Sequence, residues 1–147
     1  MNNSNILVVR DAIKSKVDDL GKLDGTFDYE TGKNEGYPFA TITPADGDSE
    51  FGDSRGGFGR NIQKMRFVVR IYQERENHLF GAEKAENVSI AVLDELLTAF
   101  HADTTLSGTV LWQRPISWDA GYNVRDQIVR TLEVTIEAVK EVDSLNT

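Results

Sequence analysis

The residues Gly52 to Gly56, with the sequence Gly-Asp-Ser-Arg-Gly, match the pattern of a nucleophile elbow. In that motif a serine sits on a tight turn between a strand and a helix, where a histidine can activate its hydroxyl. Here a glycine-rich stretch and then a strand pattern follow Ser54, and the two histidines, His78 and His101, lie at expected helix boundaries. A small serine hydrolase using Ser54 is therefore the least favoured hypothesis, and no catalytic residue is expected.

The acids Asp46, Asp48 and Glu50 alternate along the chain, as oxygen ligands do at the start of a calcium loop. The pattern fails further on, because Gly52 comes one position late for the sharp turn and Gly57 stands where a bidentate glutamate belongs. A weak divalent site shared with a neighbouring subunit stays an alternative to acids that are simply solvated. The glycines match no phosphate-binding motif. We therefore predict no metal or cofactor site.

Composition limits the classes of function that these residues can serve. At 147 residues the chain has the length of one domain, and hydrophobic residues at 39% with charged residues at 27% are typical of a soluble globular protein. A net charge of −8, from 16 basic and 24 acidic residues, disfavours sequence-specific nucleic-acid binding. The absence of cysteine excludes disulfides and fits a reducing cytoplasm. The apolar N-terminal patch, broken by Arg10 and Asp11, predicts neither a signal peptide nor a membrane span.

The N-terminal third is expected to hold one helix, one short strand and a long loop. Apolar residues recur at three- and four-residue steps from Asn3 to Leu23, which predicts an amphipathic helix. Tyr37 to Thr43 is predicted as a short strand that Pro44 stops. The stretch from Pro44 to Asn61 is acidic and glycine-rich without hydrophobic period, and we predict a long mobile loop there, suited to ordering at a partner.

The remaining elements predict an α+β fold. Period-two alternation makes Lys64 to Glu74 a central strand, with Met65, Phe67, Val69 and Ile71 toward the core. We expect a single domain over residues 1–147, with a mostly antiparallel sheet of about four strands and two main helices on one face. The later elements are a helix over Ala82 to His101, a strand over Thr109 to Trp118, a turn over Asp119 to Asn123 and a strand over Gln127 to Lys140, the last two strands forming an antiparallel hairpin.

One group of aromatic side chains and one group of charged side chains can each be interpreted in two ways. Trp112, Trp118 and Tyr122 cluster around the predicted hairpin, where aromatic residues are more often core than interface. On the outer side of the long strands, arginines alternate opposite glutamates, which indicates either cross-strand ion pairs or a contact with another subunit. These residues are Arg66, Arg70 and Arg130 opposite Glu133 and Glu137.

The order of elements resembles that of the tail terminator (tail completion) proteins of long-tailed bacteriophages and related prophages. The similarity covers nearly the whole chain and is carried by element order, length and local sequence rather than by an invariant motif. After the first helix, its segments are the strand YPFATITPAD, the acidic loop, the strand RFVVRIYQE, the helix AENVSIAVLDELLTAF and the strands TVLWQRPISW and VRTLEVTIEAV.

This resemblance implies a structural protein of the virion tail or neck, assembled in the host cytoplasm and without enzymatic activity. It implies a hexameric ring that caps the tail tube, stops tube polymerisation and offers the surface that joins the head. The partners would be further copies of this chain, the tail tube protein and a head–tail connector protein, while DNA passes through the lumen. A head-closure or adaptor protein is the alternative. The residues expected at a subunit or tail-tube interface are Asp46, Asp48, Glu50, Asp53, Arg55 and Arg60.

Overall fold

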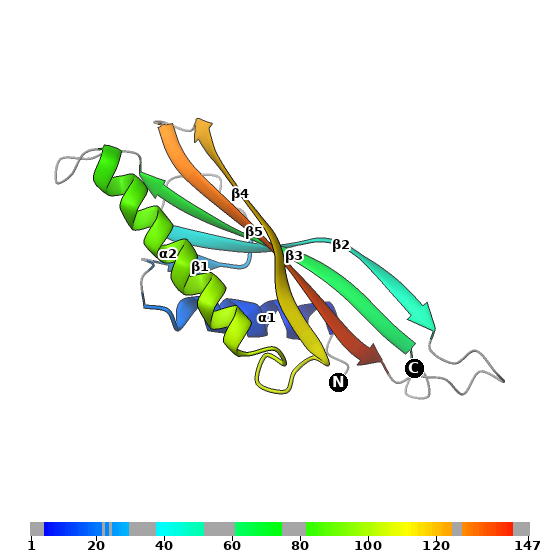
Figure 1. Ribbon diagram of the computed structural model, residues 1–147. Helices are drawn as coiled ribbons and strands as arrows, with labels where there is room; N and C mark the ends of the chain where they lie inside the picture. Colours follow the sequence, from blue (N-terminus) through cyan, green and yellow to red (C-terminus); the bar gives the residue numbers. More distant parts are fainter. Residues whose placement is uncertain are drawn as a thin grey trace.

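The computed structural model describes residues 5–21, 23, 25–29, 38–51, 61–74, 82–124 and 128–142. Within these residues the chain folds into a five-stranded sheet and two helices, which makes it an α+β protein (Figure 1). The elements in chain order are α1 (Asn5–Asp18), β1 (Gly25–Phe27), β2 (Phe39–Phe51), β3 (Asn61–Glu74), α2 (Ala82–Ala102), β4 (Trp112–Val124) and β5 (Ile128–Val142).

The sheet has the strand order β1-β2-β3-β5-β4 and is mostly antiparallel. β2–β3, β3–β5 and β5–β4 are antiparallel pairs, whereas β1 runs parallel to β2 and pairs only with Phe39 to Thr41. The sheet therefore has five strands, one more than the expected number of about four. β1 has only three residues, Gly25 to Phe27, too few for an alternating pattern to distinguish a strand from a turn.

One apolar core joins both helices to one side of the sheet. Alternate residues of β3 and β5 point toward this core, as expected from their period-two pattern, and the first helix contributes a stripe at three- and four-residue spacing. Because the same cluster contains residues of α1 and α2, both helices cover the same face of the sheet. Its members include Val9, Ile13, Val17, Ala40, Ile42, Met65, Phe67, Val69, Ile71, Val92, Leu93, Leu96, Phe100, Leu132, Val134, Ile136 and Ala138.

The long loop predicted over Pro44 to Asn61 is wrong for its first half. β2 continues past Pro44 to Phe51 and stays paired with β3 through a register shift that leaves Ala45 as an extra residue. A bulge of this kind absorbs a residue without ending the strand, and β3 supplies backbone partners whatever the side chains are. Residues 52–60 lie outside the described part of the chain.

β4 is also longer than its sequence predicted. The register between β4 and β5 shifts after Pro115, leaving Ile116 as an extra residue, and pairing then continues to Val124. The turn expected over Asp119 to Asn123 is therefore wrong, because those residues pair with the long strand β5. The antiparallel hairpin of the last two strands is confirmed.

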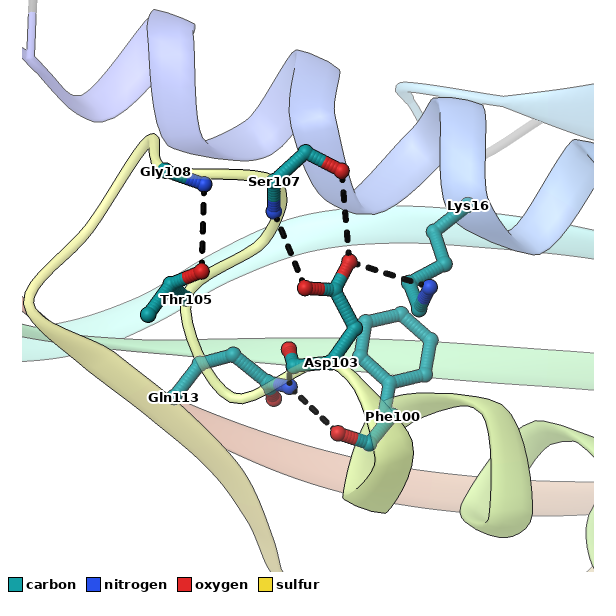
Figure 2. A network of polar contacts seen from close by, with 7 residues as sticks. All are labelled: Lys16, Phe100, Asp103, Thr105, Ser107, Gly108 and Gln113. Atoms are coloured by element: carbon teal, nitrogen blue, oxygen red, sulfur yellow. Dashed lines mark hydrogen bonds and ion pairs between the residues drawn. The ribbon is translucent and has the colours of Figure 1, made fainter.

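The connection between α2 and β4 is held by a polar network that also reaches α1 (Figure 2). The carboxylate of Asp103 accepts the Ser107 backbone N–H at 3.0 Å and pairs with Lys16 Nζ of α1 at 3.1 Å. The hydrogen bond from Ser107, and after it the Lys16 ammonium, lowers the pKa of Asp103. The side-chain amide of Gln113 donates to the Phe100 and Asp103 carbonyls at 2.6 and 2.7 Å. The start of β4 is thus fixed to both helices.

Among the described residues, no helix combines the length and apolar character needed to cross a membrane.

Candidate functional site: the outer face and edges of the sheet

The face of the sheet opposite the helices, here called the outer face, carries a row of cross-strand ion pairs. At its centre the guanidinium of Arg66 contacts Glu137 Oε2 of β5 at 3.2 Å on one side. On the other side it contacts Asp46 Oδ1 at 3.2 Å and Asp48 Oδ2 at 3.7 Å, both on β2. One cation therefore ties three strands together across the sheet.

The carboxylates around Arg66 also stabilise its charged form. The hydrogen bond with Asp46 is the main cause that raises the pKa of Arg66, and the charges of Glu137 and Asp48 add to it. Without this cation the two β2 acids would face each other on the same side of one strand. Arg66 therefore offsets the repulsion that an acidic strand end would otherwise suffer.

A second pair repeats the pattern further along the sheet. Arg70 of β3 donates from Nε to Glu133 of β5 at 2.9 Å and from Nη1 to the hydroxyl of Thr43 on β2 at 3.2 Å. Of the two interpretations, cross-strand ion pairing is therefore confirmed for both arginines of β3. Arg130 behaves differently, because it donates to Glu86 of α2 at 2.8 Å and so ties β5 to the helix.

The predicted interface residues are only partly placed. Asp46 and Asp48 lie on β2 against Arg66, in a strand rather than in a loop. Glu50 belongs to the same strand and pairs in register with Ile62, while its side chain is outside the described part. Asp53, Arg55 and Arg60, and also Ser54, lie outside the described residues.

The geometry of the acids bears on the hypothesis of a divalent site. The described carboxylates of β2, Asp46 and Asp48, both turn toward Arg66. In the described ranges, no three acidic or histidine side chains are grouped so that they could hold a metal ion. The arrangement is that of an ion-pair ladder between strands.

The two edges of the sheet are formed by β1 and β2 on one side and by β4 on the other. In the described part of the chain, β1 pairs with β2 only as far as Thr41, so β2 forms the edge of the sheet beyond that residue. β4 is the last strand at the opposite edge. The backbone N–H of Gln113 on β4 points away from β5, since it donates to the Thr104 carbonyl at 2.7 Å. By alternation the nitrogen of Pro115 faces the same outward edge, so its missing donor removes no bond to β5.

Two large apolar side chains of β4 are exposed, one in its bulge and one just beyond it. Trp118 is 57% exposed and Ile116 is 43% exposed, whereas Trp112 is partly buried. The prediction that the tryptophans belong to the core is therefore wrong for Trp118. Pro115 was the available signal, because a proline in a strand marks an edge where neighbouring side chains lack cover.

An apolar groove lies on the helix side of β2, at the opposite edge of the sheet. Its volume is about 290 Å³, and it is bounded by the first turn of α1 and by the strands β2 and β3 around their bulge. Ile6 of α1 borders the groove and is 39% exposed. The other lining residues are Pro44, Ala45, Asp46, Gly47, Gln63, Lys64, Met65, Arg66 and Phe67.

Comparison of the sequence with protein-family models and with curated proteins found no match. The geometry of the sheet and the order of elements in the chain therefore remain as indications of function.

Proposed function

We propose that this chain is a structural subunit of a phage neck, a tail terminator that assembles into a ring on the end of the tail tube. In this role it stops tube polymerisation and presents the surface to which the head is joined. The resemblance in element order suggested the class. The observation that supports it best is the projecting end of the sheet.

The strands β2, β3 and β5 continue well beyond the ends of both helices (Figure 1). At this end of the sheet Phe51 of β2 pairs with Asn61 of β3, and Asn61 pairs with Val142 of β5. A sheet end with no helix over it buries little apolar surface of its own, and the ion pairs of Arg66 join the same three strands. Such an extension gains stability when a neighbouring molecule packs on it, as in a ring or on a tube end.

The charge of the outer face also suits a conduit for DNA. Among its described side chains, the acids outnumber the bases. A surface of that kind repels a passing phosphate backbone instead of holding it. The acids are Asp46, Asp48, Asp119, Glu133, Glu137 and Glu141, and the bases are Lys64, Arg66, Arg70 and Arg114.

The decisive experiment is a tail-assembly reaction observed by electron microscopy, with and without the purified chain. We expect rings at the ends of tubes and tubes of uniform length when the chain is present, and overgrown tubes when it is omitted. Tubes that stop at the normal length without it would exclude the terminator role. Binding to heads alone would instead support the head-closure or adaptor alternative.

The proposal also predicts no hydrolytic chemistry. We expect that esterase and peptidase assays of the purified chain give no activity that Ser54→Ala abolishes. An activity lost in that variant would contradict a purely structural role. Glu50→Gln is a suitable control, because it alters a neighbouring polar residue and leaves the serine in place.

A further inference from the structure

The dipeptide Asp46-Gly47 lies in the part of β2 that has a partner strand on one side only. In the described part of the chain, pairing with β1 ends at Thr41, while β3 continues alongside β2. The side chain of Asp46 is 66% exposed. An aspartate followed by glycine is chemically labile, because glycine has no Cβ atom to shield its nitrogen from the carboxyl group of the preceding side chain.

The pairing of β2 with β3 requires both members of this dipeptide. A Cβ atom at Gly47 would lie 2.5 Å from the backbone oxygen of Lys64, so a larger residue does not fit there without movement of the strands. The carboxylate of Asp46 contacts Arg66 Nη1 at 3.2 Å and joins β2 to the cation at the centre of the outer face. The fold therefore retains a sequence that is open to a spontaneous reaction.

That reaction is the isomerisation of aspartate through a five-membered cyclic imide. The nitrogen of Gly47 attacks Cγ of Asp46, a C–N bond forms, and the carboxyl hydroxyl leaves with the amide hydrogen as water. Water then cleaves one of the two C–N bonds of the imide. Cleavage at Cγ restores aspartate, whereas cleavage at the main-chain carbonyl gives isoaspartate, with no net change in composition. The backbone of isoaspartate is one atom longer, so the residues after it cannot keep their register with β3.

Strand pairing and Arg66 both oppose the first step. Asp46 pairs in register with Arg66, and the next residue, Gly47, also pairs with β3. The extended backbone of a strand keeps the nitrogen of the following residue away from Cγ. The ion pair with Arg66 favours the carboxylate, which lacks the hydroxyl that must leave. We propose that Asp46 is a site of spontaneous isomerisation, and that pairing with β3 and the contact with Arg66 set its rate. This inference does not depend on the proposed function.

The first test compares the folded chain with the same chain in denaturant. After storage at neutral pH, peptide mapping with fragmentation that distinguishes isoaspartate from aspartate gives the rate at residue 46. Labelling with an isoaspartyl methyltransferase gives an independent measure. We expect isoaspartate at residue 46 to form at least about tenfold more slowly in the folded chain, because the reaction then needs local opening of the strand. Asp46→Glu is the control for the assignment, because its ring would need six members and it should give no product at this position.

The second test changes the cation. Arg66→Met should raise the rate in the folded chain by at least about threefold, within the range of effects that ion pairs at a surface give. Arg66→Lys, which keeps the charge, should give an intermediate rate, and Arg114→Met, which removes a cation from β4, should leave the rate unchanged. The chain contains the same dipeptide at Asp24-Gly25. Its rate should be equal in the wild type and in Arg66→Met, which controls for a general loss of stability.

Three results would overturn the inference. No isoaspartate at residue 46 in the denatured chain would remove the site itself. Equal rates at this residue in the folded and denatured chains would show that pairing with β3 does not restrain the reaction. If the rate at Asp46 is the same in Arg66→Met and in the wild type, or if Asp24 accelerates equally in the variant, the assigned role of Arg66 is wrong.

Discussion

β2 and β4 have the same length, 13 residues, and each contains one proline beside a register shift. The sequence predicts that the first strand stops at Pro44 and that the second ends at Trp118, and in both cases the strand continues further. The extra residue is Ala45 in β2 and Ile116 in β4. The same backbone device therefore occurs in β2, where pairing with β1 ends at Thr41, and in β4 at the other edge of the sheet.

The two strands differ in the residues that come after the bulge. β2 continues with acids that face Arg66 on the outer face, so its extension is held by charge. β4 continues with Ile116 and Trp118, which remain exposed, while the beginning of this strand is fixed to the helices through Asp103 and its neighbours. The end of β2 is thus stabilised by ion pairs within the chain, whereas β4 has exposed apolar side chains, and substitutions in each strand can test this difference.

The largest effect is expected from Gly47→Ala in β2. A Cβ atom at this position would lie 2.5 Å from the backbone oxygen of Lys64, so the two strands must separate. We expect the free energy of unfolding to fall by about 1–3 kcal/mol, as for other overpacked sites, measured by chemical denaturation. In β4, Gly121→Ala is the matched control: its nearest neighbour, Thr131 Oγ1, would lie at 3.6 Å, and stability should change little. Equal losses in both variants would contradict the close approach of β2 to β3.

The next effect concerns the anchor of β4. Asp103→Asn keeps a side-chain oxygen near Ser107 but removes the charge that pairs with Lys16, and we expect a loss of about 1 kcal/mol at pH 7. Because the folded-state pKa of Asp103 is lowered, its contribution is present above the ordinary value of about 3.9 and disappears as the pH falls through the folded value.

Denaturation of the wild type and of Asp103→Asn at several pH values checks this expectation. The two stability curves should differ at pH 7 and converge under acidic conditions. Ser107→Ala is the control, because it retains the backbone N–H, the main cause of the lowered pKa, and should cost less. A difference that grows as the pH falls would contradict the assigned direction.

A more local effect is expected from Arg66→Met. The change leaves Asp46, Asp48 and Glu137 without the cation that they share, so the extension of β2 should open more often while the core remains folded. Hydrogen exchange of the backbone amides over residues 46–48 should become faster. Arg114→Met removes a cation of β4 that stacks on Trp112, and it should leave exchange in β2 unchanged. Equal exchange in the wild type and Arg66→Met would show that strand pairing alone holds the extension.

The face of the sheet that the helices cover was predictable from the sequence, because buried apolar residues recur at every second position of a strand. Met65, Phe67, Val69 and Ile71 alternate toward the helices, and the wide apolar stripe of α2 matches the surface it covers. The cross-strand pairs of Arg66 and Arg70 were also predictable, since register follows once the buried residues are aligned.

The edges were not predictable by the same argument. The polar residues from Ala45 to Phe51 have no hydrophobic pattern, yet they form a strand because β3 offers backbone partners along its whole length. The exposure of Trp118 depends on its being at an edge, which the type of this residue does not reveal and only the nearby Pro115 indicates. The groove depends on where the first turn of α1 lies against the bulge of β2, which no local pattern contains.

The smallest effect on stability is expected from Pro115→Ala. This variant tests whether the bulge of β4 depends on its proline. The nitrogen of residue 115 faces away from β5, on the same edge as the Gln113 N–H that donates to Thr104, so the variant gains an outward donor and loses no bond to β5. Stability should fall by no more than about 1 kcal/mol, chiefly because the unfolded chain becomes less restricted.

The position of Trp118 reports on the bulge itself. In a Trp112→Phe background its emission is the only tryptophan signal, and it should remain that of an exposed side chain after Pro115→Ala. If the proline created the bulge, its removal would let Ile116 enter the register and turn each later residue of β4 to the opposite face. The emission of Trp118 would then change, and so would its access to a soluble quencher. Unchanged quenching would instead place the cause of the bulge in the pairing of β4 with β5, leaving Trp118 exposed whatever residue stands at position 115.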